Sequence, residues 1–387
     1  MHASGRVTAA IARPDADCGR RAGERQRKLL KPAGALGRLE ELACWWAARQ
    51  RRDVPRRVRP AITVFAADHG VARCNVSAYP ASVTREMLRA IAQGGAAISV
   101  LAREVGASLT IVDVGVDVAA DVGLGGVGDI EADSATNTAV GADPAVDCGA
   151  HTARLRPPRT HCERIAQGTR DLSVDAAMSI AQARRALDIG AHYARVAIDA
   201  GHDLLIAGEI GIGNTTAASC LIAATLEAEP DAVVGTGTGI DATRRARKLA
   251  IVRQALARHG RDRRPLPLLA SLGGYEIAAM TGYYLEAARA GVPCMLDGFI
   301  SAAAALVGCT LDPALRDWLI AAHLSAERGH AAALERLGLR PLLECDLRLG
   351  EGTGAALAVP LIQAAIRIHA EMATFEEAGV STRTDAC

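Results

Sequence analysis

The sequence contains little lysine and few aromatic residues. Among 44 lysine and arginine side chains only Lys28, Lys31 and Lys248 are lysines, and aromatic residues make up 3% of the 387 positions. Scarce aromatics leave few stacking platforms for single-stranded nucleic acid. The formal net charge of +1 provides no overall field that would attract polyanions or acidic membranes. These shortages argue against a protein that binds nucleic acid.

The ten cysteines show no metal-binding arrangement. They form no C-x-x-C pair and no Cys/His pattern with zinc spacing, which predicts reduced thiols in a cytoplasmic protein and no metal site. His69, His323 and His330 lack a second ligand at helical spacing, so core or capping roles are favoured. No apolar run reaches the ~18 residues that span a bilayer, and the amino terminus lacks the apolar stretch of a secretory signal. We therefore expect no membrane partner.

The common nucleotide-binding and hydrolase signatures are missing as well. No G-x-x-x-x-G-K-[ST] loop occurs, which argues against a P-loop ATPase. The segment GLGGVG at 123–128 has the spacing of a dinucleotide fingerprint, but the acidic stretch after it cannot form the helix that would carry a pyrophosphate. No G-x-S-x-G elbow supports an α/β-hydrolase.

Apolar β-type segments alternate with long helical patterns through most of the chain, half of which is hydrophobic. We predict strands at 61–67, 108–116, 203–208, 232–235, 292–298, 317–324 and 341–347, and helices at 82–104, 173–199, from 214 onward and at 241–259. The strands are apolar throughout rather than alternating, which is typical of a sheet covered on both faces. The sequence therefore predicts an α/β fold with a mostly parallel sheet and helices on both faces.

The two ends of the chain lack strands. Helical patterns at 24–31, 37–51 and 353–374 predict a small helical domain formed by residues 1–60 and 353–387. Residues 61–352 form the large α/β domain, which contains a Gly/Ala/Asp-rich insertion at 118–160. That insertion is too long for an ordinary connection, so a mobile loop is favoured over a lid. The tail from 376 onward is expected to fray.

Polar side chains follow the predicted strands at the points where they end. They are Asp68, His69, Asp113, Glu209, Asp297, His323, Ser325 and Glu351. Because the carboxyl ends of parallel strands meet at one edge of a sheet, these loops are expected to converge on a ligand crevice.

Two glycine-rich loops lie before helices. GEIGIGNTTAAS at 208–219 places Asn214 and Thr215 where they cap a helix, and its free N–H groups would suit a phosphate, although an ordinary turn fits equally well. VVGTGTGID at 233–241 precedes a helix that carries Lys248. A lysine retained in a chain that otherwise uses arginine favours a phosphate partner over a leftover surface residue.

Glu351 lies among Gly350, Gly352 and Gly354 in LRLGEGTGAALA. Small flanking residues let a ligand approach, and burial would raise the pKa of this carboxylate toward that of a general base. A glutamate that only complements the helix dipole explains the pattern equally well.

Ten motifs then suggest a family by their order. They are KPAGALGRLEELA, FAADHGVA, SAYPASVTREML, GGAAISVLA, GEIGIGNTTAAS, GTGTGIDATRRARK, SLGGYEIAAMTG, MLDGFISAAAAL, HLSAERGH and LRLGEGTGAALA. In this order, over roughly residues 24–372, the chain resembles the nicotinate-nucleotide:dimethylbenzimidazole phosphoribosyltransferases.

The resemblance implies a reaction, a fold and partners. The expected enzyme, a glycosyltransferase, moves the phosphoribosyl group of nicotinate mononucleotide to 5,6-dimethylbenzimidazole, giving α-ribazole 5'-phosphate and nicotinate for the lower ligand of cobalamin. The expected fold is a Rossmann-like α/β domain plus a small helical domain built from both termini, in a homodimer. No cofactor is expected, and no pyrophosphate leaves, so the reaction does not require Mg²⁺.

The resemblance also assigns site residues. It makes Glu351 the base that removes the benzimidazole proton, and Glu209 is our candidate for the carboxylate that stabilises positive charge on the ribose. The residues implied to hold the phosphoribosyl group are Gly211, Gly213, Asn214, Thr215, Gly237, Lys248 and Ser325. Those implied to border the base are Ser77, Tyr79, Pro80, Glu86 and Leu349.

Three positions depart from the family pattern. Glu86 stands where Gln is common, which puts the selectivity for the base in doubt, and Ala35 and Asp171 replace a common Ser and Asn. Two other functions fit some of the same features, namely a noncatalytic nucleotide-binding regulator and, less well, a nicotinamide-dependent dehydrogenase. Release of nicotinate would distinguish the enzyme from both.

Overall fold

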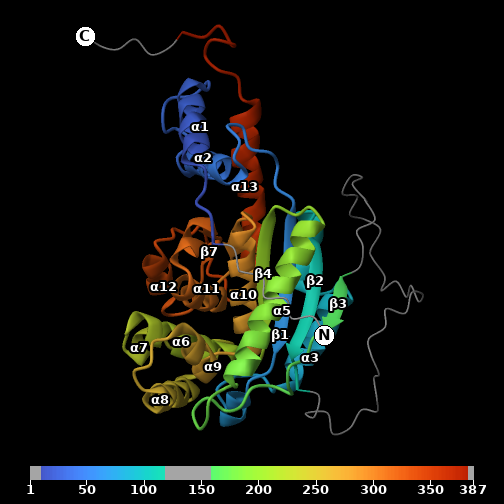
Figure 1. Ribbon diagram of the computed structural model, residues 1–387, viewed down its shortest axis with the longest axis vertical. Coiled ribbons are helices and arrows are strands. Elements are labelled where there is room, and N and C mark those ends of the chain that lie inside the picture. The colour runs from blue at the N-terminus through green and yellow to red at the C-terminus, as the bar shows by residue number, and fades with distance from the viewer. Residues whose placement is uncertain (1–9, 118–157, 382–387) are drawn as a thin grey trace, which may run out of the picture.

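A six-stranded parallel sheet forms the centre of the molecule (Figure 1). The computed structural model describes residues 10–117 and 158–381. The strands are β1 (Pro60–Ala67), β2 (Ser108–Gly115), β3 (Arg159–Cys162), β4 (Leu204–Ile210), β5 (Cys294–Leu296) and β6 (Leu319–Ala321). Their order is β3-β2-β1-β4-β5-β6 and every pairing is parallel. The predicted Rossmann-like α/β class is therefore confirmed.

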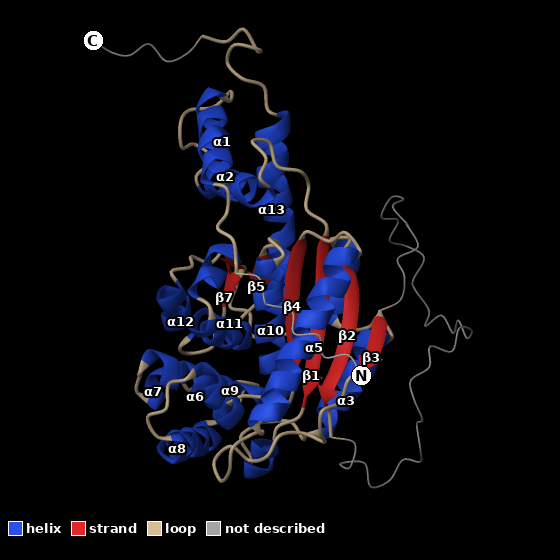
Figure 2. Cartoon of the chain, in the orientation of Figure 1, coloured by secondary structure: helices blue, strands red, loops and turns tan. Residues whose placement is uncertain are grey.

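Helices cover both faces of this sheet (Figure 2). In β1, Phe65 packs into one apolar cluster with α5 (Ile180–Asp199) and α10 (Tyr275–Arg289), while Val64 packs into the other with α4 (Ala97–Glu104) and α13 (Thr353–Glu371). Successive side chains of a strand point to opposite faces, so a strand whose residues are all buried needs helices on each side. All eight residues of β1 are buried.

Further helices surround this core. They are α1 (Ala16–Lys28), α2 (Arg38–Gln50), α3 (Ser82–Ala92), α6 (Asn214–Leu226), α7 (Pro230–Val233), α8 (Ala242–His259), α9 (Pro265–Leu272), α11 (Phe299–Leu311) and α12 (His330–Leu337). Two 3-10 turns (Gly70–Cys74 and Pro313–Trp318) and a small parallel sheet of β7 (His323–Leu324) with β8 (Leu343–Glu344) complete the described elements.

The helices α5 and α10 cross at two glycines. A Cβ added at Gly190 would lie 1.7 Å from the carbonyl oxygen of Ala279, and one added at Gly282 would lie 2.0 Å from that of Leu187. Each glycine therefore lets the backbone of one helix touch the other, and this contact fixes the layer that covers β1 and β2.

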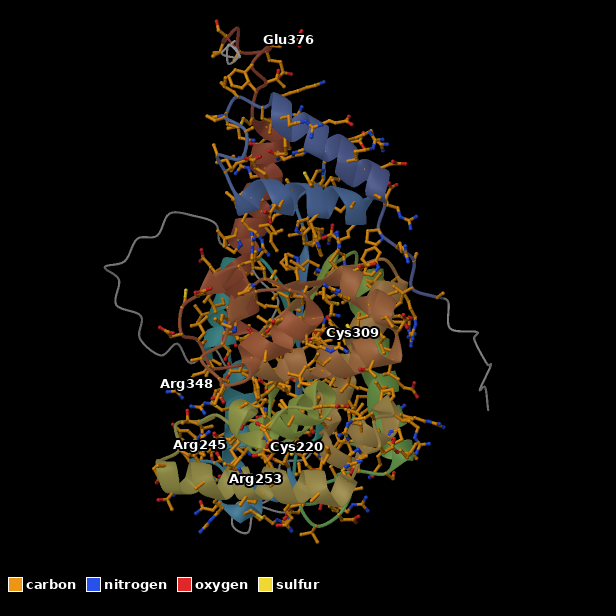
Figure 3. The ribbon with its side chains drawn as sticks, turned by 90° about the vertical axis from the view of Figure 1, so that its left-hand side faces the viewer. Cys220, Arg245, Arg253, Cys309, Arg348 and Glu376 are labelled. Carbon is orange, nitrogen blue, oxygen red and sulfur yellow. The ribbon has the colours of Figure 1, made fainter. Side chains whose placement is uncertain are left out.

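Segments from both ends of the chain lie side by side at one end of the molecule, in the view of Figure 1 and in the turned view of Figure 3. α1 packs on α2, and α13 packs on α2. Arg25 donates to the carbonyl oxygen of His369 at 2.9 Å, and Leu29 forms an isolated antiparallel β-bridge with Thr374.

α13 is the one described helix long and apolar enough to cross a membrane by length and composition, but 56% of its apolar window is buried inside the protein.

Several predicted element boundaries are wrong. Residues 232–235 do not form a strand, because Pro230 opens the short helix α7 there. The predicted helix 82–104 breaks at the Gln93–Gly95 turn, where Gly94 has φ +83°. The helix predicted from 173 begins only at Ile180, where Ser179 and Gln182 form a capping box. α1 begins earlier than predicted, at Ala16, because Asp15 caps its first turn.

The carboxyl-terminal strands are shorter than predicted. The apolar run 317–324 divides into β6 and β7, which belong to different sheets, and only two residues of the run 341–347 pair as β8. β3 was not predicted, since its sequence RTHC carries no apolar pattern. The insertion predicted at 118–160 ends too late, because residues 159 and 160 begin β3. Its other predictions, the glycine segment 123–128 and a mobile loop, fall on residues 118–157, and the end of the tail predicted to fray from 376 falls on residues 382–387, all of which lie outside the described residues.

Candidate active site

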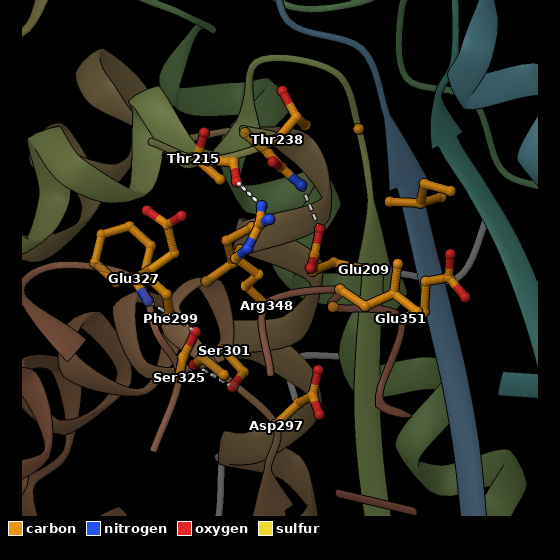
Figure 4. A pocket seen from close by; sticks show the side chains of 18 of the residues that line it. Glu209, Thr215, Thr238, Asp297, Phe299, Ser301, Ser325, Glu327, Arg348 and Glu351 are labelled. Atoms are coloured by element: carbon orange, nitrogen blue, oxygen red, sulfur yellow. Dashed lines mark hydrogen bonds between the residues drawn. The ribbon is translucent and has the colours of Figure 1, made fainter. Parts of the chain in front are cut away.

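A pocket of about 370 Å³ opens at the carboxyl ends of the sheet strands (Figure 4). The residues that line it include Glu209 at the end of β4, Asp297 at the end of β5, Ser325 in the loop after β7, and Glu351 in the turn before α13. The predicted convergence of strand-end loops is therefore correct for these residues. It is wrong for Asp113, which binds Arg164 at 2.5 Å outside the pocket.

Asp68 and His69 also lie outside this pocket. They line an adjacent cavity of about 180 Å³ that shares Tyr79 with the larger one. His69 pairs with Glu276 at 2.7 Å, and both side chains are fully buried. The structure therefore gives His69 a core pairing, as the sequence favoured.

Glu351 sits on a strained turn. Its φ is +64°, between Gly350 at +83° and Gly352 at +89°. A residue with a side chain rarely adopts this left-handed conformation, which costs of order 1 kcal/mol and marks candidate functional positions. The Glu351 N–H donates to the carbonyl oxygen of Glu209 at 3.2 Å, and this bond joins the turn to the end of β4.

Asp297 holds the other side of this turn. Its carboxylate accepts from the N–H of Gly352 at 3.2 Å and of Ala355 at 2.9 Å, and so it caps α13. His323 approaches it at 3.8 Å. Asp297 thus fixes the start of α13 and places a negative charge beside Glu351.

Glu351 has the protonation behaviour of a general base. Its side chain is buried, Oε2 has no hydrogen-bond partner among the described residues, and its pKa rises to about 7. Burial is the main cause, the charge of Asp297 adds to it, and the backbone N–H of Ile98 opposes it. A carboxylate with this pKa can remove a proton near neutral pH.

Glu209 is a second buried carboxylate. Burial raises its pKa well above the ordinary value, and the charges of Glu276, Asp297 and Glu351 raise it further, while a hydrogen bond from the Asn214 amide lowers it. A Cβ at Gly350 would lie 2.3 Å from Glu209 Oε1, so this glycine is required for the carboxylate to sit there. A cation bound in the pocket would favour ionisation of Glu209.

The loop after β4 brings a helix start to the pocket. Gly211, Asn214 and Thr215 line the wall, and α6 begins at Asn214 after Gly213, which has φ +100°. A Cβ at Gly211 would lie 2.1 Å from the carbonyl oxygen of Ala67, so this loop lies against the end of β1. The N–H groups of Asn214 and Thr216 donate to the carbonyl oxygens of Gly211 at 3.2 Å and Gly213 at 3.0 Å. The positive end of the helix dipole at this start favours an anion.

Lys248 lies behind this wall rather than in it. It is fully buried, and its ammonium donates to Thr215 Oγ1 at 2.8 Å. Burial lowers its pKa to about 8, against the charge of Glu327. A Cβ at Gly237 would lie 3.3 Å from Lys248 Nζ, so the glycine loop 233–241 passes close over the lysine.

The base-side residues divide into two groups. Tyr79 and Leu349 line the pocket and are exposed, with 54% and 58% of their surface accessible. Ser77 instead contacts Thr238 at 3.3 Å, and Pro80 lines the adjacent cavity. Glu86 is exposed on α3 and lines neither, because Val83 and Met87 occupy the face of this helix that meets the pocket.

Several residues of this wall were not predicted from the sequence. Arg348 directly precedes Leu349, is exposed at the edge of the body (Figure 3), and donates to the carbonyl oxygen of Gly237 at 3.1 Å. Glu327, Phe299, Thr238 and Met87 also line the pocket. A cation next to a glycine turn was a usable signal for Arg348, whereas Phe299 and Met87 look like ordinary core residues in the sequence.

Comparisons with known proteins agree on one family. A family model described as Phosphoribosyltransferase matches residues 11–380. The nicotinate-nucleotide–dimethylbenzimidazole phosphoribosyltransferase of Chromobacterium violaceum is 49% identical to this chain, and the match covers 93% of this chain and 95% of the relative. The enzyme of the same name from Azotobacter vinelandii is 48% identical, and the match covers 93% of each chain.

A solved structure leads to the same family. The crystal structure of CobT from Thermus thermophilus has a TM-score of 0.83 and 44% identity, and the match covers 95% of this chain and 100% of that one. These matches extend over both the sheet and the pocket-forming loops. The chain belongs to the nicotinate-nucleotide–dimethylbenzimidazole phosphoribosyltransferase family and is an enzyme of the phosphoribosyltransferase type.

Proposed function

We propose that this protein transfers the phosphoribosyl group of nicotinate mononucleotide to 5,6-dimethylbenzimidazole, with α-ribazole 5'-phosphate and nicotinate as products. The observation that carries the proposal is Glu351, a buried carboxylate with a pKa of about 7 in the wall of the pocket. The chemistry needs one such group. The benzimidazole must lose its N–H proton as its other nitrogen attacks, while nicotinate leaves as a pyridine that needs no acid.

The pocket supplies the remaining contacts. Thr215, the start of α6 and Arg348 offer hydrogen-bond donors and positive charge for the phosphate. Glu209 becomes ionised as positive charge develops on the ribose ring, and stabilises it. Tyr79 and Leu349 offer the benzimidazole an apolar border at the pocket mouth. Attack from the face opposite nicotinate converts the β-nucleotide into an α-product.

A product assay tests the proposed function. The purified protein is mixed with nicotinate mononucleotide and a panel of benzimidazoles, purines and phenols, and the products are resolved by mass. We expect release of nicotinate together with an α-ribotide of at least one azole. Binding of the mononucleotide without release of nicotinate from any mixture would indicate a regulator, and would overturn the proposal.

Substituting Lys248 by Ala is expected to weaken binding of nicotinate mononucleotide by roughly 10- to 100-fold, the range for a lost hydrogen bond to a charged group. The reason is that Lys248 Nζ donates to Thr215 Oγ1 and adds positive charge behind the pocket wall. Calorimetric titration with the mononucleotide measures the loss. Lys28→Ala, at the exposed end of α1, is the matched control and leaves the affinity unchanged. An unchanged affinity in Lys248→Ala would refute the phosphate role.

The pH dependence of kcat/KM follows from the pKa of Glu351. The base must be ionised, so kcat/KM is expected to rise with pH through about 7 and then level off. Asp297→Asn removes the negative charge that helps to raise this pKa, and the rise therefore moves to lower pH. The measurement is a pH series of initial rates for both proteins. A rise that stays at the same pH in Asp297→Asn would contradict the assignment.

We also propose that the protein is a cytoplasmic homodimer. The eight described cysteines are free thiols, which supports a reducing compartment, and the family resemblance supports the dimer. Light scattering of the purified chain tests the second point, and a mass of one chain would reject it.

A further inference from the structure

Glu327 is a buried carboxylate in the pocket wall to which neither the resemblance nor the proposed reaction gives a role. It follows Ser325 in the loop between β7 and α12 and is 7% exposed. Its backbone is fixed, because its N–H donates to Ser325 Oγ at 3.3 Å and its carbonyl oxygen accepts from the His330 N–H at 3.2 Å. Its Oε2 has no hydrogen-bond partner among the described residues.

The fold makes room for this carboxylate. A Cβ at Gly235 would lie 2.2 Å from Glu327 Oε2, so the glycine loop 233–241 needs a residue without a side chain at that point. Lys248 approaches the same loop at Gly237, and the charge of Glu327 raises the pKa of this lysine against the effect of burial. No ion pair joins Glu327 to a cation in the described part of the chain, although an unpaired buried carboxylate is costly. We therefore expect a bound ligand to supply the hydrogen bonds that the Glu327 carboxylate lacks.

The functional groups of nicotinate mononucleotide limit which hydrogen-bond donors can reach Glu327. An ionised carboxylate only accepts hydrogen bonds. The phosphate and the ring carboxylate of nicotinate mononucleotide are anions, which Glu327 repels, so the two ribose hydroxyls are the donors that the substrate offers. Acidic side chains bind ribose hydroxyls in the same way at the strand ends of other Rossmann-like folds.

The positions of the neighbouring groups agree with this chemistry. Figure 4 shows Arg348 between Glu327 on one side of the pocket and Glu209 on the other. Glu327 is next to Ser325, and the glycine loop that it touches leads to Gly237, which also lines the pocket. A ribose whose phosphate lies near Thr215 and Arg348 would present its hydroxyls to this side of the wall.

We propose that Glu327 accepts hydrogen bonds from the 2'- and 3'-hydroxyls of the ribose and thereby makes the enzyme select ribonucleotides over deoxyribonucleotides. This inference rests on the proposed function. A site built to bind a substrate hydroxyl rejects analogues that lack it, because its buried polar group is left without a partner.

The test compares nicotinate mononucleotide with its 2'-deoxy and 3'-deoxy analogues in wild-type protein and in Glu327→Gln. In the wild type we expect kcat/KM to fall by at least ~10²-fold for each analogue. In Glu327→Gln, kcat/KM for the ribonucleotide falls by a similar factor, while the values for the analogues change little. The discrimination between ribose and deoxyribose therefore collapses to within about 10-fold.

A carboxylate that merely balances Lys248 would give a different pattern. Glu327→Gln would then lower kcat/KM for all three nucleotides equally, and unchanged discrimination would overturn the inference. Glu335→Gln, on the exposed side of α12, is the matched control and leaves all the values unchanged. Glu327→Asp serves if the glutamine variant does not fold, and its shorter side chain is expected to reduce the discrimination.

Failure of the proposed function is distinguishable from failure of this inference. If the wild type releases no nicotinate from nicotinate mononucleotide with any azole, both the proposed function and the role of Glu327 are rejected. If the wild type is active but accepts deoxyribose and ribose equally, only the inference about Glu327 fails.

Discussion

Replacing Glu351 by Gln lowers kcat for α-ribazole phosphate formation by about 10²- to 10⁴-fold, the usual contribution of a positioned general base. The amide keeps the shape of the side chain but cannot take the benzimidazole proton. Because Thr215, Arg348 and the start of α6 are untouched, binding of nicotinate mononucleotide is expected to persist within a few-fold. The measurements are single-turnover rates by mass spectrometry and mononucleotide affinity by calorimetry.

Stability provides an internal check on this variant. The folded-state pKa of Glu351 is raised to about 7, so wild-type stability falls as pH rises from the ordinary glutamate value through about 7. Glu351→Gln lacks this loss and is expected to be at least as stable as the wild type at pH 8. Glu344→Gln, an exposed change on β8, is the control for activity. Turnover near the wild-type value in Glu351→Gln would remove the base from the mechanism.

Replacing Gly190 by Ala is expected to destabilise the fold by about 3 kcal/mol or more, the upper range for overpacking of a tight contact. The added methyl group would meet the carbonyl oxygen of Ala279 at 1.7 Å, and a backbone atom cannot move aside as a flexible side chain can. The helices α5 and α10 must then separate over β1 and β2. Thermal unfolding is expected to show a melting temperature lower by roughly 5 °C or more.

Gly23→Ala is the matched control, since it makes the same change inside the helix α1. The nearest atom to the added methyl group there is Cys44 Sγ at 4.0 Å, an ordinary contact. Alanine has the higher helix propensity, so this variant is expected to gain up to about 1 kcal/mol. Equal melting temperatures for the two variants would show that the glycine contact does not hold α5 against α10.

The sheet could be predicted because its longer strands have a distinctive composition. The runs that became β1, β2 and β4 are apolar over most of their length rather than alternating, and this pattern is typical of strands buried on both faces. The strand predicted at 232–235 has a similar composition, but Pro230 and Asp231 start a helical turn there. A four-residue apolar run does not distinguish a strand from a helix end.

The site could be predicted where the backbone needs glycine. Gly211 and Gly350 marked the turns that bring Glu209 and Glu351 together, and those glycines avoid close contacts that the structure shows. Side-chain direction was not readable. Glu86 comes one position before Met87 on α3, a rotation of about 100°, and this removes it from the pocket face. Glu327 enters the pocket only through tertiary packing.

Because the chain has only three lysines, acylation of Lys248 can report on opening of the pocket wall. Lys248 is fully buried and Lys31 is 7% exposed in an ion pair with Glu40, while Lys28 is exposed. Among the three lysines an amine-acylating reagent therefore reacts with Lys28 first, and it reaches Lys248 only in molecules whose pocket wall has opened. The rate of acylation at Lys248, measured from peptide masses, therefore reports how often the wall opens, and no probe has to be introduced into the chain.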